Sequence, residues 1–192
     1  MRYAIKWPEY ARQWNLMRVN DGRIPEFERE ASEAIRHKDI YRQIEAKTGV
    51  PWYLVAILHR RESNADFRTY LGNGQPLDHV TTIVPRGRGP FRGPDAFVRG
   101  AIDALNIDLL SSVKDWRLEK CLFYCELFNG TGYANRGLPS PYVWGGTNIQ
   151  KLGKYIRDGV FDSHVVDPQP GCAPLLKMIA HLDSSVVLER ET

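Results

Sequence analysis

Hydrophobic positions recur at helical spacing over much of the chain. Between Pro25 and Gly49 apolar residues stand three to seven positions apart, and early glutamates suit a helix amino end. We predict a helix there that ends at Gly49, and a second one that begins at Pro51, whose missing N–H costs little in a first turn. The same spacing predicts further helices over 98–109, 118–128, 149–156 and 175–186.

Two segments lack this spacing. Residues 1–25 predict an irregular arm, and its aromatic side chains, such as Trp7 and Trp14, indicate packing on the body. Residues 64–94 are punctuated by glycine and proline around a β-prone run, VTTIV, which predicts a small hairpin. A segment of this length inside a compact domain indicates function. The predicted fold is therefore mainly α: a helical body over 26–192, with a β-hairpin lobe inserted after the second helix.

Composition narrows the class of protein. With 192 residues, 43% hydrophobic and 26% charged, the chain predicts one folded domain. A formal charge of +3 suits an anionic polymer, but the chain has no basic run and no nucleic-acid motif, so we expect no nucleic-acid partner. It has no apolar run long enough for membrane insertion, and we expect no secretory signal because the first residues lack an apolar stretch. Three cysteines argue against a disulfide framework, and nothing requires more than a monomer.

Glu62 is the strongest candidate for chemistry. Helical spacing puts it on one face with Val55, Leu58 and His59, at the end of an apolar stripe. Desolvation there would raise the pKa of its carboxyl, as a general acid for glycosidic cleavage requires. His59 lies one turn earlier and either hydrogen-bonds Glu62 or serves the core. The alternative for Glu62 is a salt bridge to one of three arginines, Arg60, Arg61 or Arg68.

Several motifs occur in a characteristic order: RESNADFRTYLGNGQPL, VPRGRG, LFNGTGY and SPYVWGGTN. Together they resemble phage and prophage endolysins of the lysozyme superfamily, related to goose-type lysozymes and lytic transglycosylases. The match runs over about 44–176. The resemblance implies cleavage of the β-1,4 bond between N-acetylmuramic acid and N-acetylglucosamine in peptidoglycan, with Glu62 as general acid and without metal or cofactor. It also implies synthesis in a bacterial cytoplasm and action on the periplasmic wall once the inner membrane is breached.

A second carboxylate is normally required for hydrolysis. The candidates are Asp66, which can equally be a turn residue, and Asp78, which is better placed to face a cleft. Gln75 departs from the family pattern, because an acid is expected at that position. If neither aspartate serves, Glu62 acting alone gives the transglycosylase outcome, in which the sugar's own 6-hydroxyl attacks.

Substrate contacts are expected in the glycine-rich segment after 128. Asn129 continues the apolar stripe of its helix, so its amide is expected on the core side, where a sugar N-acetyl group can satisfy it; the alternative is a helix cap with Gly130 just beyond. Tyr133 and Tyr142, with Trp144, are expected to be exposed enough to stack on sugars, or else to brace the loop.

Other functions are less well supported. Cys172 with His164 or His181 carries no cysteine-hydrolase motif, and the histidines lack zinc-ligand spacing. A wall-binding module with weak or no catalysis is the main alternative to an enzyme, and a basic nucleic-acid binder is a third.

Overall fold

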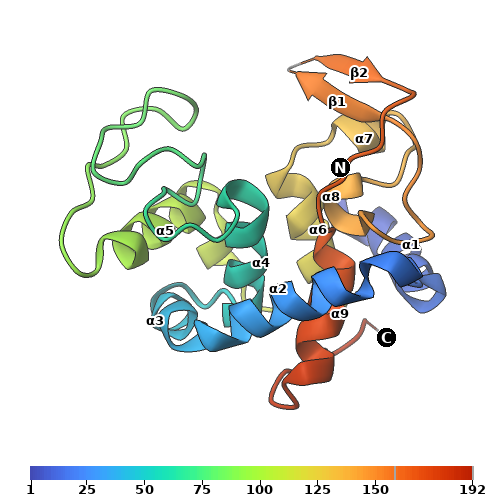
Figure 1. The fold of residues 1–192 in the computed structure, drawn as a ribbon, viewed down its shortest axis with the longest axis horizontal. Helices are drawn as coiled ribbons and strands as arrows, with labels where there is room; N and C mark the ends of the chain where they lie inside the picture. The colour runs from blue at the N-terminus through green and yellow to red at the C-terminus, as the bar shows by residue number, and fades with distance from the viewer. Residues whose placement is uncertain (158, 192) are drawn as a thin grey trace. The chain divides into compact units, whose positions relative to one another are not determined.

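The computed structural model describes residues 1–157 and 159–191. The described chain is mainly helical with one small antiparallel sheet, which confirms the predicted mainly α class (Figure 1). The helices are α1 (Tyr3–Leu16), α2 (Ile24–Arg36), α3 (Lys38–Thr48), α4 (Trp52–Ser63), α5 (Ala96–Ile107), α6 (Leu118–Phe128), α7 (Gly132–Asn135), α8 (Pro141–Trp144) and α9 (Cys172–Leu182). Two 3-10 turns occupy Asp21–Arg23 and Leu110–Ser112, and the strands are β1 (Lys154–Arg157) and β2 (Val160–Asp162).

The chain divides into two compact units. Glu33–Trp116 form one, here the middle unit; Met1–Ser32 together with Arg117–Thr192 form the other, here the terminal unit. Among the described residues no helix is both long and apolar enough to cross a membrane.

The middle unit is built from α3, α4 and α5. Every residue of α4 from Trp52 to His59 is buried, so this helix is enclosed all round rather than on one stripe. Gly49 ends α3 in the left-handed conformation (φ 73°), and Pro51 precedes the first turn of α4, both as predicted. The helix that carries Glu62 is nevertheless the fourth in the chain, because the 25–49 pattern splits into two helices near His37 and α1 precedes them.

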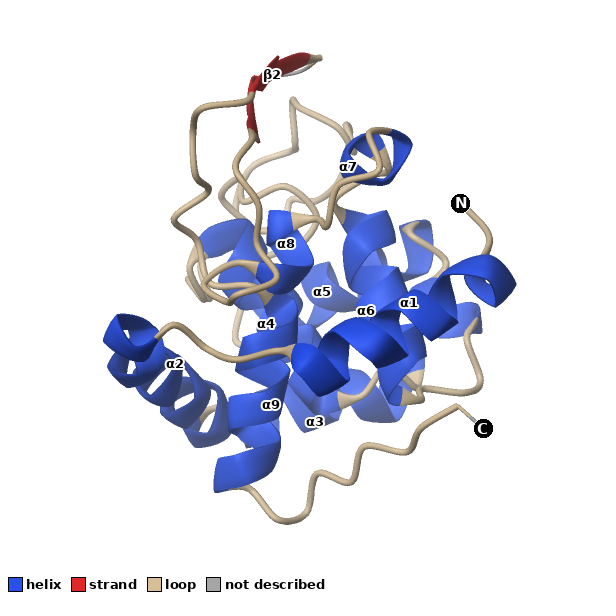
Figure 2. Cartoon of the chain, turned by 90° about the vertical axis from the view of Figure 1, so that its right-hand side faces the viewer, coloured by secondary structure: helices blue, strands red, loops and turns tan. Residues whose placement is uncertain are grey.

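The predicted hairpin lobe over 64–94 is wrong. The segment forms an irregular loop with one isolated β-bridge, between Thr69 and Pro76, and VTTIV forms no strand (Figure 2). Two amides of the β-prone run bond a side chain: Gln75 Oε1 accepts hydrogen bonds from the backbone N–H groups of Thr82 and Ile83. Thr81 pairs through its backbone with Gly87 and Arg88, but this pairing does not extend into a strand.

The terminal unit begins with α1, so the prediction of an irregular arm is also wrong. The helix spans Tyr3–Leu16 with Pro8 inside it, and Tyr10 on it is buried against α6. A proline inside a helix removes one backbone hydrogen bond, so a proline in the sequence predicts that a helix ends there. Burial of Tyr10 against α6 outweighs that cost.

The helix predicted over 149–156 is a strand at its end. Lys154–Arg157 pair antiparallel with Val160–Asp162, with Tyr155 opposite Phe161 and their ring centroids 5.2 Å apart. Gly153 precedes the strand at φ 119°, a conformation that a helix excludes. The only sheet in the described chain is therefore in the terminal unit, where none was predicted.

Candidate functional site

Glu62 lies in the last turn of α4 and is partly exposed. The helix ends because Asn64 and Ala65 are left-handed (φ 55° and 57°), and the Ala65 N–H donates to the His59 carbonyl (3.2 Å). Arg60 Nη1 donates to Asn64 Oδ1 (2.5 Å), and Ser63 Oγ donates to the His59 carbonyl (3.3 Å). These bonds fix the helix end, and with it the backbone of Glu62.

The following loop closes directly on this helix end. Gly74 is left-handed (φ 71°), and a Cβ there would lie 3.1 Å from the Glu62 carbonyl oxygen. The Gly74 N–H donates to the Tyr70 carbonyl (2.8 Å). A residue with a side chain would therefore have to move the loop away from Glu62.

Gln75 organises the same loop. Its Oε1 accepts from Thr82 N–H (2.7 Å) and Ile83 N–H (3.1 Å), and its Nε2 donates to Thr82 Oγ1 (2.9 Å). Its backbone carbonyl accepts from Tyr70 N–H (2.7 Å). Gln75, which the sequence presented only as a departure from a family pattern, holds two stretches of the loop together.

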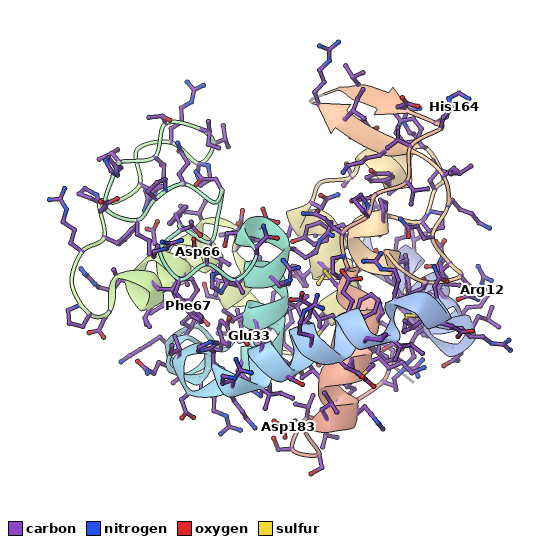
Figure 3. The ribbon with its side chains drawn as sticks, in the orientation of Figure 1. Arg12, Glu33, Asp66, Phe67, His164 and Asp183 are labelled. Carbon is purple, nitrogen blue, oxygen red and sulfur yellow. The ribbon has the colours of Figure 1, made fainter. Side chains whose placement is uncertain are left out.

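Asp66 stands in the turn after α4, where Figure 3 labels it beside Phe67. Arg68 donates to both carboxylate oxygens, from Nε (2.9 Å) and Nη2 (2.7 Å). These bonds lower the pKa of Asp66 to about 2, so the group is ionised at neutral pH. Because Arg68 pairs with Asp66, it is not the salt-bridge partner considered for Glu62.

Asp78 is exposed and is hydrogen-bonded to its neighbour, since its Oδ1 lies 2.6 Å from His79 Nδ1. It lines a cavity of about 650 Å³ whose wall also includes Asp66, Leu77 and Phe91. Glu62 is not among the residues that line this cavity. The structure therefore brings the two aspartates to one pocket, but it does not bring Glu62 into that pocket with them.

His59 belongs to the core beneath this turn. It is fully buried, its Nδ1 lies 3.0 Å from the Tyr41 hydroxyl, and its ring contacts Phe67 and Phe97 (centroids 4.8 and 4.3 Å). Burial lowers its pKa to about 4, although the nearby backbone and carboxylate of Asp66 partly offset this. Its ring bonds Tyr41 rather than Glu62, so the structural interpretation is confirmed and a Glu62 bond is wrong.

Asn129 and Gly130 end α6 in the terminal unit. The Asn129 N–H donates to the Cys125 carbonyl (3.3 Å), Gly130 is left-handed (φ 90°), and both residues are exposed. The core-side position expected for the Asn129 amide is wrong, and the helix-end alternative is confirmed. The apolar stripe gave the wrong prediction for Asn129 because the last residues of α6 are not buried by other elements, and Phe128 is only half-buried.

Tyr133 and Tyr142 are buried, at 6% and 3% exposure, and Trp144 is buried as well. The expectation that these rings are open to sugars is wrong. The Tyr133 hydroxyl accepts from the Tyr155 N–H (3.1 Å), and its ring packs edge-on against Tyr155 (5.2 Å). Tyr133 thus braces the loop against the hairpin, as the alternative held.

Two features of the terminal unit were not predicted from the sequence. Glu126 is buried in α6 and accepts a hydrogen bond from the Tyr10 hydroxyl (2.5 Å); burial raises the pKa of its carboxyl. The Arg136 guanidinium lies 4.2 Å from the centre of the Phe161 ring. The position of Glu126 among the apolar residues of α6 was a signal that its carboxyl is buried. The Arg136–Phe161 contact depends on the β1–β2 hairpin, which the spacing of apolar residues did not predict.

No group of three His, Cys, Asp or Glu side chains in the described ranges is placed to hold a metal ion. The cysteines, Cys121, Cys125 and Cys172, are buried and form no disulfide. Searches of protein-family models, curated proteins and solved structures return no match to this chain.

Proposed function

We propose that the chain is a lysozyme-like, peptidoglycan-degrading glycosidase in which Glu62 is the general acid. The observation that supports this most is the placement of Glu62: a partly exposed carboxyl in the last turn of an otherwise enclosed helix, with Gly74 seated on its backbone. The ordered motifs around it resemble those of endolysins. The substrate bond is the β-1,4 link between N-acetylmuramic acid and N-acetylglucosamine, and the role is lysis of a bacterial wall after the membrane is breached.

In this mechanism Glu62 transfers a proton to the glycosidic oxygen while the sugar bond breaks. Hydrolysis then needs a carboxylate to activate water or to attack the sugar. Asp78 is the hydrolytic candidate because it is exposed and lines a pocket. No metal or organic cofactor takes part.

A transglycosylase is the second candidate function, and specific contacts favour it. Asp66 is held by Arg68, and the pocket that Asp78 lines does not include Glu62. In this mechanism Glu62 acts without a second carboxylate: its conjugate base accepts the proton of the sugar's 6-hydroxyl, which attacks and yields 1,6-anhydro products.

The test is release of soluble fragments from dye-labelled sacculi by the wild type, Glu62→Gln and Asp78→Asn. Loss of a general acid lowers rates by about a hundredfold or more, so Glu62→Gln is expected to be nearly inactive. An equal loss in Asp78→Asn supports hydrolysis, and a small one supports the transglycosylase. A wild type that binds sacculi without releasing fragments supports the wall-binding module instead.

A further inference from the structure

The loop between α4 and α5 displays a cluster of aliphatic side chains. Val80, Ile83 and Val84 are 50%, 51% and 78% exposed, within five consecutive residues. We call these three residues the aliphatic tip. Single exposed aliphatic residues are ordinary on protein surfaces, but three of them in one short segment indicate a surface for interaction.

Hydrogen bonds hold the tip in this exposed position. Thr81 is buried, and its hydroxyl donates to the Pro85 carbonyl (2.6 Å) and accepts from the Arg88 N–H (3.0 Å). The Thr81 backbone also pairs with Arg88 and Gly87 (2.9 Å each). Together with the Gln75 amide bonds, these contacts fix the chain on both sides of Ile83 and Val84. The loop is therefore ordered with its aliphatic side chains outward.

The charges around the tip are mixed, and the cation nearest to Val84 in the sequence is Arg86. From His79 to Pro94 the sequence contains three arginines, and Asp78 and Asp95 flank this stretch. Arg88 is paired with Asp103, and Arg92 donates to the Asp78 carbonyl (3.1 Å). Arg86 is exposed, and its side chain makes no hydrogen bond or ion pair within the part of the chain that the structure describes.

We propose that the aliphatic tip is a peripheral membrane contact: Val80, Ile83 and Val84 enter the interface of an anionic bilayer, and Arg86 meets lipid phosphates. Aliphatic side chains beside a cation match the layered chemistry of such an interface, where apolar area and basic charge add to binding. A glycan strand fits less well, because sugar faces are bound by flat aromatic rings and the tip has none. The contact is reversible, unlike a membrane span, and does not depend on the proposed glycosidase activity.

The experiment is co-sedimentation of the full chain with vesicles of phosphatidylglycerol and phosphatidylcholine, and with vesicles of phosphatidylcholine alone. The wild type is expected to partition onto the anionic vesicles, and increasingly so as salt is lowered. Ile83→Asp with Val84→Asp is expected to reduce partitioning at least about tenfold, because two aliphatic contacts are lost and two negative charges are added. Val187→Asp is the matched control, since Val187 is 75% exposed in the terminal unit.

Charge gain is separated from apolar loss by Ile83→Ser with Val84→Ser, which must also weaken binding. Arg86→Gln is expected to weaken binding and to reduce its salt dependence. The proposal is overturned if the wild type does not sediment with anionic vesicles, or if the tip variants partition as Val187→Asp does. Binding to sacculi but not to vesicles overturns it too, in favour of a wall contact. Far-UV circular dichroism verifies that each variant is folded.

Discussion

At the residue scale, Gln75 acts through its side-chain amide. Gln75→Ala removes the acceptor of the Thr82 and Ile83 amides and is expected to lower the free energy of unfolding by about 1–2 kcal/mol. Gln75→Glu keeps the acceptor oxygen and is expected to cost less. The measurement is the hydrogen-exchange rate of the Thr82 and Ile83 backbone amides, which should be faster in Gln75→Ala than in Gln75→Glu. Equal exchange in the two variants would contradict the role given to the amide oxygen.

His59 makes stability depend on pH. Its pKa of about 4 in the folded chain lies below the ordinary 6.5, so the unfolded chain binds the proton first as pH falls. The stability associated with a neutral His59 is present above pH 6.5 and is lost by about pH 4, a loss of about 3 kcal/mol. Urea unfolding across this interval is expected to show the wild type losing stability relative to His59→Gln. A difference between the two that does not change with pH would show that His59 titrates normally.

At the element scale, the packing of α1 on α6 includes a buried polar pair. Tyr10→Phe leaves the buried Glu126 carboxyl without its hydroxyl donor and is expected to cost about 1–3 kcal/mol. Tyr155→Phe is the control, because Tyr155 is half-buried and its hydroxyl accepts an exposed hydrogen bond from Arg136 Nε (3.0 Å), which water can replace. Urea midpoints that fall equally in the two variants would mean that α1 is only loosely attached.

The junction between α8 and α9 depends on two glycines in backbone contact. A Cβ at Gly145 would lie 2.5 Å from the Gln169 carbonyl oxygen, and the Gly171 N–H donates to the Gly145 carbonyl (2.9 Å). Gly145→Ala is expected to lower the free energy of unfolding by about 1–3 kcal/mol. Gly22→Ala, where nothing lies within 4 Å of the added Cβ, should change it by less than about 0.5 kcal/mol. Thermal unfolding that is alike in both variants would refute the close contact.

Sequence reasoning succeeded where burial repeats along one element. Gly49, Pro51 and the periodic runs of α5 and α6 predicted helix ends to within a few residues, because capping and helical spacing are local. It failed where a distant partner decides. Ile149, Leu152 and Ile156 imitate a helical stripe, but Gly153 and pairing with β2 make the segment a strand. Helix α1 was not predicted because it contains Pro8, and its stability comes from packing on α6.

At the scale of the whole molecule, the sequence predicted the position of Glu62 at a helix end, but it did not predict which candidate site residues are exposed and which are buried. The middle unit holds Glu62, Asp66 and Asp78, and the terminal unit holds Asn129 and the tyrosines. Spacing placed Glu62 at a helix end, where it lies. Exposure was not predictable from the local pattern. Asn129 is exposed and Tyr133 is buried, because burial depends on which other elements cover a residue. The ion pair of Asp66 with Arg68 also required the folded turn.

We propose that Glu62 cleaves glycan strands by protonating the leaving oxygen. The test of this role is mass spectrometry of muropeptides released from purified sacculi, with Glu62→Gln in parallel. We expect the wild type to release products with reducing or 1,6-anhydro sugar ends, the first meaning hydrolysis and the second a transglycosylase, and we expect the variant to release neither. Absence of release by the wild type, or undiminished release by Glu62→Gln, would contradict the assignment.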